Sequence, residues 1–213
     1  MAIDFSSITN GSAAAAPTPA PAPATGGVSL NLSKGMTLDL TKKNPGLTKI
    51  KAGLGWDVAA AGGADFDLDI SAFICRGGKI SSGNDVVFFN NMEQPGVKLM
   101  GDNRTGAGEG DDEVIVVDLS AIDPAVDKIV FAVTIFEAAT RRQTFGMVNS
   151  SYIRLLDAAN NDKELCRFEL KDAFSTETAL IFAALQKNGS DWDFTAIGDG
   201  KQGDLNALAG LFV

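Results

Sequence analysis

Two acidic stretches carry the side chains best suited to chemistry. The first, Asp65-Phe66-Asp67-Leu68-Asp69, alternates carboxylates with apolar residues, and the second is the glycine-rich run GDNRTGAGEGDDE over residues 101–113. Strand periodicity puts the carboxylates of the first stretch on one face, where they repel one another unless a positive charge lies among them. Glycines let the second stretch fold around an ion and offer backbone carbonyls. Oxygen ligands alone predict calcium before zinc or copper.

Neither stretch fits an EF-hand. Counted from Asp65, the positions that require glycine and glutamate are Ile70 and Arg76. Counted from Asp102, the third and fifth positions are not acidic. We therefore expect a different calcium site, in which the strand acids meet the glycine-rich loop across one end of a sandwich, with Asp57 as a further candidate ligand. The alternative is a solvated acidic rim that holds no metal.

The composition excludes several classes of enzyme. The sequence of 213 residues contains no histidine, which removes Ser-His-Asp and Cys-His catalysis and the HExxH zinc hydrolases. Cys75 and Cys166 lie far apart without a CxxC neighbour, so we expect buried thiols in a reducing cytosol, with a single disulfide as the alternative. We predict that the protein is not an enzyme. The enzymatic alternative is an acid-rich metal site that hydrolyses phosphoesters or nucleotides.

The formal charge of −9 indicates which partners to expect. A negative protein is unsuited to nucleic acid and to anionic membranes, and it favours cations or basic proteins. No apolar run approaches the roughly 20 residues that cross a bilayer, so we expect no direct membrane insertion. The first residues lack the features of a secretory signal. These observations together predict a soluble, cytoplasmic protein.

The N-terminal residues 1–27 differ in composition from the rest. Residues 11–27 read GSAAAAPTPAPAPATGG, an Ala/Pro-rich linker that cannot build a core. Residues 1–10 form a short peptide that we expect to be disordered, as termini commonly are. Its apolar residues offer a structural alternative for the function, in which the peptide docks on an assembly and the linker tethers a domain. We expect residues 28–213 to form that single domain.

The elements that must position the acids are short strands separated by Gly, Asn and Asp. This pattern predicts an all-β fold, a β-sandwich of two packed sheets with short peripheral helices. Residues 129–136 are apolar on both faces and should form a central strand. One helix is expected near the C-terminus, with Asp204 as its N-cap and Leu205, Leu208 and Leu211 on its inner side. The expected strands cover Val28–Leu32, Met36–Leu40, Phe66–Cys75, Val86–Phe89, Val114–Leu119, Lys128–Phe136, Tyr152–Asp157, Glu164–Leu170, Ala179–Gln186 and Trp192–Ile197.

Several longer motifs identify a family. They are GLGWDV at 53–58, DFDLDISAF at 65–73, FFNN at 88–91, GDNRTGAGEGDDE at 101–113, DKIVFAVTI at 127–135, RRQTFG at 141–146, YIRLLD at 152–157 and STETA at 175–179. Together they resemble the TerD family of tellurium-resistance and stress proteins over residues 28–213. The Ala/Pro-rich tail departs from the family, as does Phe136-Glu137, where many relatives resemble a His-Asp pair.

The resemblance implies a calcium-binding β-sandwich that acts as a scaffold or sensor in tellurite resistance and the general stress response. It also implies a location in the cytoplasm or at the inner membrane face, and partners among the other proteins of that system. Carried over residue by residue, the family's calcium ligands fall on Asp57, Asp67, Asp69, Asp102, Asn103, Asp111, Asp112 and Glu113, with Asp65 and Glu109 as further candidates.

Overall fold

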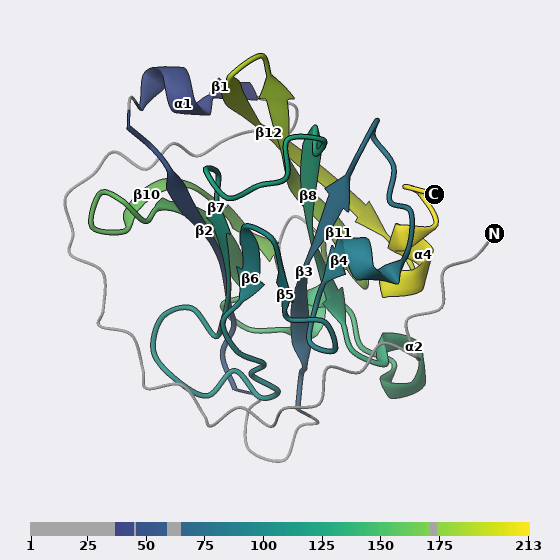
Figure 1. The fold of residues 1–213 in the computed structure, drawn as a ribbon. Coiled ribbons are helices and arrows are strands. Elements are labelled where there is room, and N and C mark those ends of the chain that lie inside the picture. Colours follow the sequence, from purple (N-terminus) through teal and green to yellow (C-terminus); the bar gives the residue numbers. More distant parts are fainter. Residues whose placement is uncertain (1–36, 45, 59–64, 171–173) are drawn as a thin grey trace.

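The computed structural model describes residues 37–44, 46–58, 65–170 and 174–213. Within these ranges the chain forms two six-stranded sheets that pack against each other (Figure 1). Every pair of neighbouring strands is antiparallel. The predicted all-β sandwich with short helices is therefore confirmed. The predicted strand at 28–32 and the N-terminal segment 1–27 lie outside the described residues.

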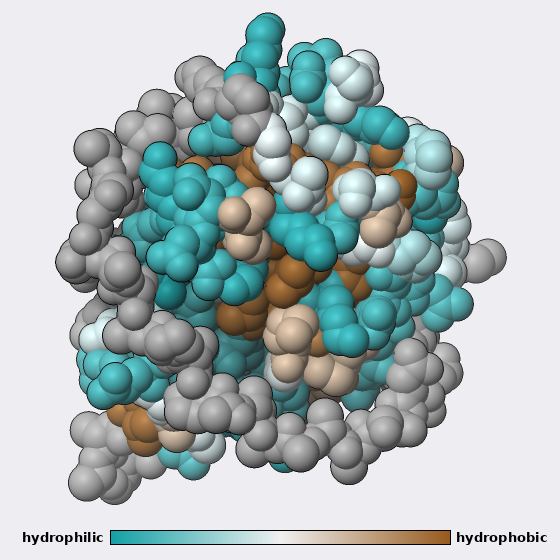
Figure 2. Space-filling model, turned by 60° about the vertical axis from the view of Figure 1, so that its left-hand side comes forward, coloured by the Kyte–Doolittle hydropathy of each residue, from teal (hydrophilic) through white to brown (hydrophobic). Residues whose placement is uncertain are grey.

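Sheet A contains the strands in the spatial order β10-β9-β2-β7-β6-β5. Their bounds are β2 Lys49–Gly55, β5 Glu93–Gln94, β6 Val97–Leu99, β7 Glu113–Asp118, β9 Tyr152–Asp157 and β10 Lys163–Glu169. Figure 2 shows the side of the molecule that carries this sheet, where a short band of hydrophobic residues lies within a mostly hydrophilic surface.

Sheet B has the order β1-β12-β11-β8-β3-β4. Its strands are β1 Thr37–Asp39, β3 Leu68–Cys75, β4 Val86–Val87, β8 Lys128–Ile135, β11 Ala179–Asn188 and β12 Asp191–Lys201. The helices are short and lie outside the sheets: α1 Leu40–Lys43, α2 Ala138–Arg141, α4 Leu205–Ala209, and the 3-10 turns η1 Gly83–Asp85 and η2 Phe145–Met147. Among the described residues, no helix is both long enough and apolar enough to cross a membrane.

Alternating side chains of sheet B enter two separate apolar layers. In β8, Ile129 and Phe131 belong to the main core between the sheets, whereas Val130 and Ala132 belong to a second cluster on the outer face. This arrangement confirms the expected central strand, because β8 pairs with β3 on one side and β11 on the other. The outer cluster includes Leu208 of α4, so this helix covers part of the outer face of sheet B.

Several local predictions need correction. Strand β2 was not predicted, although it lies in the middle of sheet A. Strand β12 continues four residues beyond the expected end at Ile197, through a backbone with positive φ at Gly198. The C-terminal helix is present, and Asp204 caps it by accepting a hydrogen bond from the Ala207 amide at 2.9 Å. Leu211, however, is 56% exposed because α4 ends at residue 209.

Candidate metal centre

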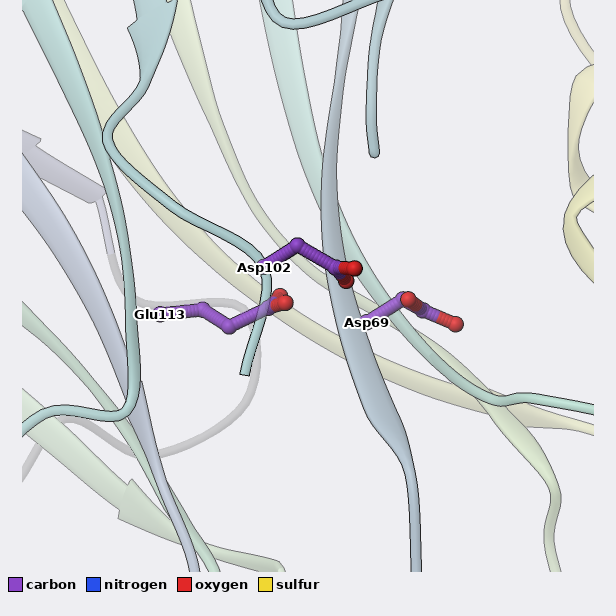
Figure 3. A group of neighbouring side chains, drawn as sticks. All are labelled: Asp69, Asp102 and Glu113. Atoms are coloured by element: carbon purple, nitrogen blue, oxygen red, sulfur yellow. The ribbon is translucent and has the colours of Figure 1, made fainter. Parts of the chain in front are cut away.

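Three carboxylates from separate parts of the chain converge beside β3. Asp69 belongs to β3, Asp102 to the loop between β6 and β7, and Glu113 is the first residue of β7. One oxygen from each lies within 4.8 Å of the others. Figure 3 shows Asp102 and Glu113 approaching β3 from one side, while Asp69 extends on the other. Two oxygens on opposite sides of a calcium ion are about 5 Å apart, so all three can reach one such ion.

Backbone amides hold Glu113 in place. Glu113 points inward from β7, in the alternating pattern that also buries Ile115. One of its oxygens accepts a hydrogen bond from the Ile70 amide at 2.8 Å, and the other accepts one from the Asn103 amide at 3.3 Å. Its side chain therefore connects the glycine-rich loop, sheet A and β3 at one point.

The centre is strongly negative for its degree of burial. Asp69 and Glu113 are 5% and 1% exposed. Burial raises the pKa of both carboxyls well above their ordinary values, and neighbouring acids raise it further: Asp67 and Asp102 for Asp69, and Asp69 for Glu113. The charged forms are thus unfavourable here unless a cation accompanies them.

Asp67 lies beside this group and has an incomplete set of partners. Asp67 is 5% exposed, and its pKa is raised by burial first and then by the charge of Asp102. Arg104 Nε lies 3.8 Å from Oδ2, but the Arg104 side chain is 70% exposed and its charge is correspondingly screened. Oδ1 is buried and has no hydrogen-bond partner in the described part of the chain. An unpaired buried carboxylate oxygen fits an oxygen-seeking cation.

Asn103 organises the glycine-rich loop from within. Its Oδ1 accepts hydrogen bonds from the amides of Thr105 and Gly106, both at 3.1 Å, and its Nδ2 donates to Asp112 at 2.8 Å. Gly106 has φ +69°, and a Cβ there would lie 2.5 Å from Nε1 of Trp56. The loop therefore packs closely on Trp56, and the Asn103 side chain is engaged in turn hydrogen bonds.

Asp111 turns to the outer face of sheet A. Its Oδ1 accepts hydrogen bonds from Arg154 Nε at 2.8 Å and from the Tyr152 hydroxyl at 3.0 Å. The side chain lies over Gly53, where a Cβ would be only 2.2 Å from Oδ2. Arg154 is 8% exposed and also pairs with Glu164 at 3.4 Å. Asp111 thus belongs to a buried ion-pair network that anchors the end of the loop to sheet A.

Asp112 fixes the loop to the end of β2. Its Oδ2 accepts a hydrogen bond from the Trp56 amide at 2.9 Å, and its own amide donates to the Leu54 carbonyl at 2.8 Å. The Asp112 pKa is raised to about 6, chiefly by burial. The Trp56 hydrogen bond opposes this rise, and the charges of Asp111 and Asp57 add to it. Asp57 itself is exposed.

The structure thus divides the predicted ligands into three sets. It brings together Asp69, Asp102 and Glu113, with Asp67 beside them, and it engages Asn103, Asp111 and Asp112 in other contacts. Asp57, Asp65 and Glu109 are exposed. That these residues bind calcium stays a prediction. Arg154 was not predicted to take part, although a single arginine inside the apolar strand YIRLLD is a signal for a buried ion pair.

Comparisons with known proteins agree with this fold. The family model described as "TerD domain" matches residues 28–212. General stress protein 16U of Bacillus subtilis is 46% identical over 186 residues, which cover 85% of this chain and 96% of that protein. Tellurium resistance protein TerD of Serratia marcescens is 42% identical over 188 residues, covering 87% and 97% respectively.

A solved structure gives the same fold. The crystal structure of a homologue of the telluride resistance protein TerD from Streptomyces coelicolor aligns with a TM-score of 0.66 at 23% identity, covering 77% of this chain and 96% of that one. At this identity the likeness concerns the fold alone. The family model and the relatives above 40% identity carry the assignment further than the fold: this chain belongs to the TerD family.

Proposed function

We propose that this protein is a non-enzymatic, calcium-binding scaffold or sensor of the tellurite-resistance and stress-response system. Membership of the TerD family supports the biological setting, since relatives carry the names of tellurium-resistance and general stress proteins. We further propose that it acts in the cytoplasm, together with other proteins of that system, some of them at the inner membrane face. The calcium part of the proposal depends on the geometry beside β3.

The observation that carries the proposal is the convergence of Asp69, Asp102 and Glu113 within 4.8 Å. Two of these acids are buried, and burying an ionised carboxylate costs several kcal/mol unless a positive charge or hydrogen bonds compensate for it. Among the described residues, no lysine or arginine forms an ion pair with these three acids, and Arg104, which pairs with the neighbouring Asp67, is mostly exposed. A hard divalent cation would compensate for the charge and use only the oxygen ligands that are present.

The arrangement also suggests how the site could act as a switch. Asp69 belongs to a strand of sheet B, whereas Asp102 and Glu113 lie in and after the glycine-rich loop. Bound calcium would supply the positive charge that lets these carboxylates stay ionised at short range. Without it, their repulsion acts between the loop and β3. The loop surface would then differ in order and in charge between the two states, and a partner protein can recognise that difference.

Calorimetric titration of the metal-stripped full-length protein with calcium, and then with magnesium, tests the proposal. We expect calcium to bind more tightly, because magnesium needs near-ideal octahedral geometry and dehydrates reluctantly. Asp69→Asn and Glu113→Gln should each weaken calcium binding by at least about tenfold, since each removes an ionised ligand. Glu93→Gln, which alters an exposed acid paired with Lys98 in the β5–β6 hairpin, is the matched control.

Asp111→Asn distinguishes the observed geometry from the full ligand set that the family resemblance implies. Asp111 is held by Arg154 and Tyr152 on the other face of sheet A, so its substitution should change calcium affinity much less than that of Asp69. Absence of calcium binding by the wild-type protein would overturn the proposal. Equal loss on substitution of Asp111 and Asp69 would show that the loop rearranges on binding.

A further inference from the structure

A cavity lies on the outer face of sheet B, behind Asp69. Its volume is about 660 Å³. It is open to solvent on one side and bordered by the turn after β4, the segment around α2 and the residues that lead into α4. Figure 1 shows α2 and α4 on the same side of the molecule. Ligand pockets in proteins commonly have volumes of about 300–1,000 Å³, so this cavity is large enough for a small organic molecule.

The walls combine aromatic rings with carboxylates. Phe88, Phe89 and Phe136 line the cavity, and the Phe89 and Phe136 rings meet edge to face with centroids 5.9 Å apart. Asp69 and Glu137 also line it. Among the described residues that surround the cavity, there is no lysine or arginine. The chemistry of this wall is thus apolar and negative.

Asp69 is the most informative of these acids. It is 5% exposed, it occupies the β3 face that also carries Phe73, and it pairs in register with Thr134, another residue of the cavity wall. Its carboxylate receives no hydrogen bond from any residue in the described part of the chain. Buried carboxylate oxygens normally accept hydrogen bonds, so a ligand that donates a hydrogen bond to Asp69 would supply the missing partner.

A basic side chain beside the cavity wall, Arg141, is already engaged with two residues of that wall. The guanidinium of Arg141 lies 5.2 Å from the centroid of the Phe136 ring and pairs with Glu137, with 3.6 Å between Nε and Oε2. It shows that a cation is accommodated against this ring, on a surface next to the cavity. An anionic ligand would meet the buried carboxylate of Asp69, and no lysine or arginine among the described lining residues would offset that repulsion.

We propose that this cavity binds a small organic cation, with an ammonium group directed at Asp69 and an apolar body against Phe89 and Phe136. Ammonium groups bind carboxylates through charge-assisted hydrogen bonds and bind the faces of aromatic rings through cation–π attraction. The inference goes beyond the calcium function. It stands on the cavity and its walls, and is tested without calcium, so that failure of one proposal leaves the other intact.

Three probes with one aromatic body test the charge requirement: benzylammonium, benzyl alcohol and benzoate. Each is titrated into the full-length, calcium-free protein, and amide shifts are followed by two-dimensional NMR. We expect benzylammonium to shift amides at residues 88–90, 134–140 and 202–206. Benzyl alcohol should bind about tenfold more weakly because it lacks the charge, and benzoate should cause no such shifts.

Variants separate the cavity from general attraction to an acidic protein. Asp69→Asn, Glu137→Gln and Phe89→Leu should each weaken benzylammonium binding by about fivefold or more, whereas Glu93→Gln removes the same charge at a remote exposed position and should have no effect. Two-dimensional spectra of the variants verify that each is folded. Equal binding of all three probes, shifts spread over surface acids, or no shift from benzylammonium at millimolar concentration would each overturn the proposal.

Discussion

Acidification should stabilise the metal-free protein, contrary to the usual behaviour of paired carboxylates. The folded-state pKa values of Asp69, Asp112 and Glu113 are raised, in each case chiefly by burial. Between the unfolded and folded pKa values, the folded state therefore binds more protons than the unfolded state. Stability is then greatest below the unfolded pKa and is lost as the pH rises through the folded pKa. For Asp112 the window runs from 3.8 to about 6.

The magnitude follows from Asp112, whose pKa is about 6 in the folded state and whose ordinary value is 3.8. Lowering the pH from 7 to 5 protonates most of this group in the folded state and little of it in the unfolded state, which adds about 1 kcal/mol to the free energy of unfolding. Asp69 and Glu113 add contributions of the same sign. For a chain of this size, about 1 kcal/mol raises the melting temperature by about 2–4 °C.

Urea unfolding of chelator-treated protein at pH 7 and pH 5, followed by tryptophan fluorescence, measures the effect. Trp56 and Trp192 are both buried and report the transition. The absence of histidine removes the side chains that ordinarily titrate in this range. The pKa values of Asp118 and Asp123 are lowered, so these groups act below the window.

Two controls accompany the measurement. Asp112→Asn keeps an acceptor for the Trp56 amide and should reduce the gain between pH 7 and pH 5 by about 1 kcal/mol, leaving the part due to Asp69 and Glu113, whereas Glu93→Gln should leave the gain unchanged. With saturating calcium the sign should reverse, because protons then compete with the ion for the same carboxylates. If the metal-free protein loses stability between pH 7 and pH 5, the acids are not held in the buried, repelling arrangement described above.

Three other perturbations have definite expectations. Gly53→Ala would place a Cβ 2.2 Å from Asp111 and should cost about 1–3 kcal/mol in urea unfolding, whereas Gly210→Ala, with 3.5 Å of space, should be nearly neutral. Arg154→Met should cost about 3–5 kcal/mol because it removes the cation from the buried carboxylate of Asp111, and adding Asp111→Asn should recover part of this loss. Burial raises the pKa of Cys75 to about 11 and that of Cys166 to about 12, so a thiol reagent should label them only as fast as the protein opens; rapid labelling of the folded protein would contradict their burial.

The strands that could be predicted were those with continuous or alternating apolar residues. The runs that became β3 and β8 are apolar on both faces, which is typical of strands in the middle of a sandwich. Strand β2 was not predicted because its sequence, KIKAGLG, contains two glycines, which are poor strand formers. Those glycines are explained only by long-range contacts: the Asp111 side chain lies over Gly53, and the Tyr152 ring lies over Gly55.

The location of the candidate site was predictable, but the role of each acid was not. Clustered carboxylates and glycines indicate a loop suited to an ion, whichever strand it meets. The distribution of Asp111, Asp112 and Glu113 among three different partners depends on Arg154, Trp56 and Ile70, which lie more than 40 residues away in the sequence. Local spacing carries no information about such partners.

The contact between Glu113 and the Ile70 amide also bears on self-association. In the described residues β4 pairs with β3 only at Ala72 and Phe73, so the first half of β3 has no strand partner on that side, and Glu113 bonds to its Ile70 amide instead. An edge strand with unpaired backbone groups can pair with a strand of another molecule, which leads to aggregation, and charged side chains at the edge disfavour that pairing. Because Glu113 already accepts the Ile70 hydrogen bond, that amide is not available to a strand from another molecule. Removing this carboxylate would return an unpaired amide to the edge of sheet B, where a second copy of the chain could pair with it.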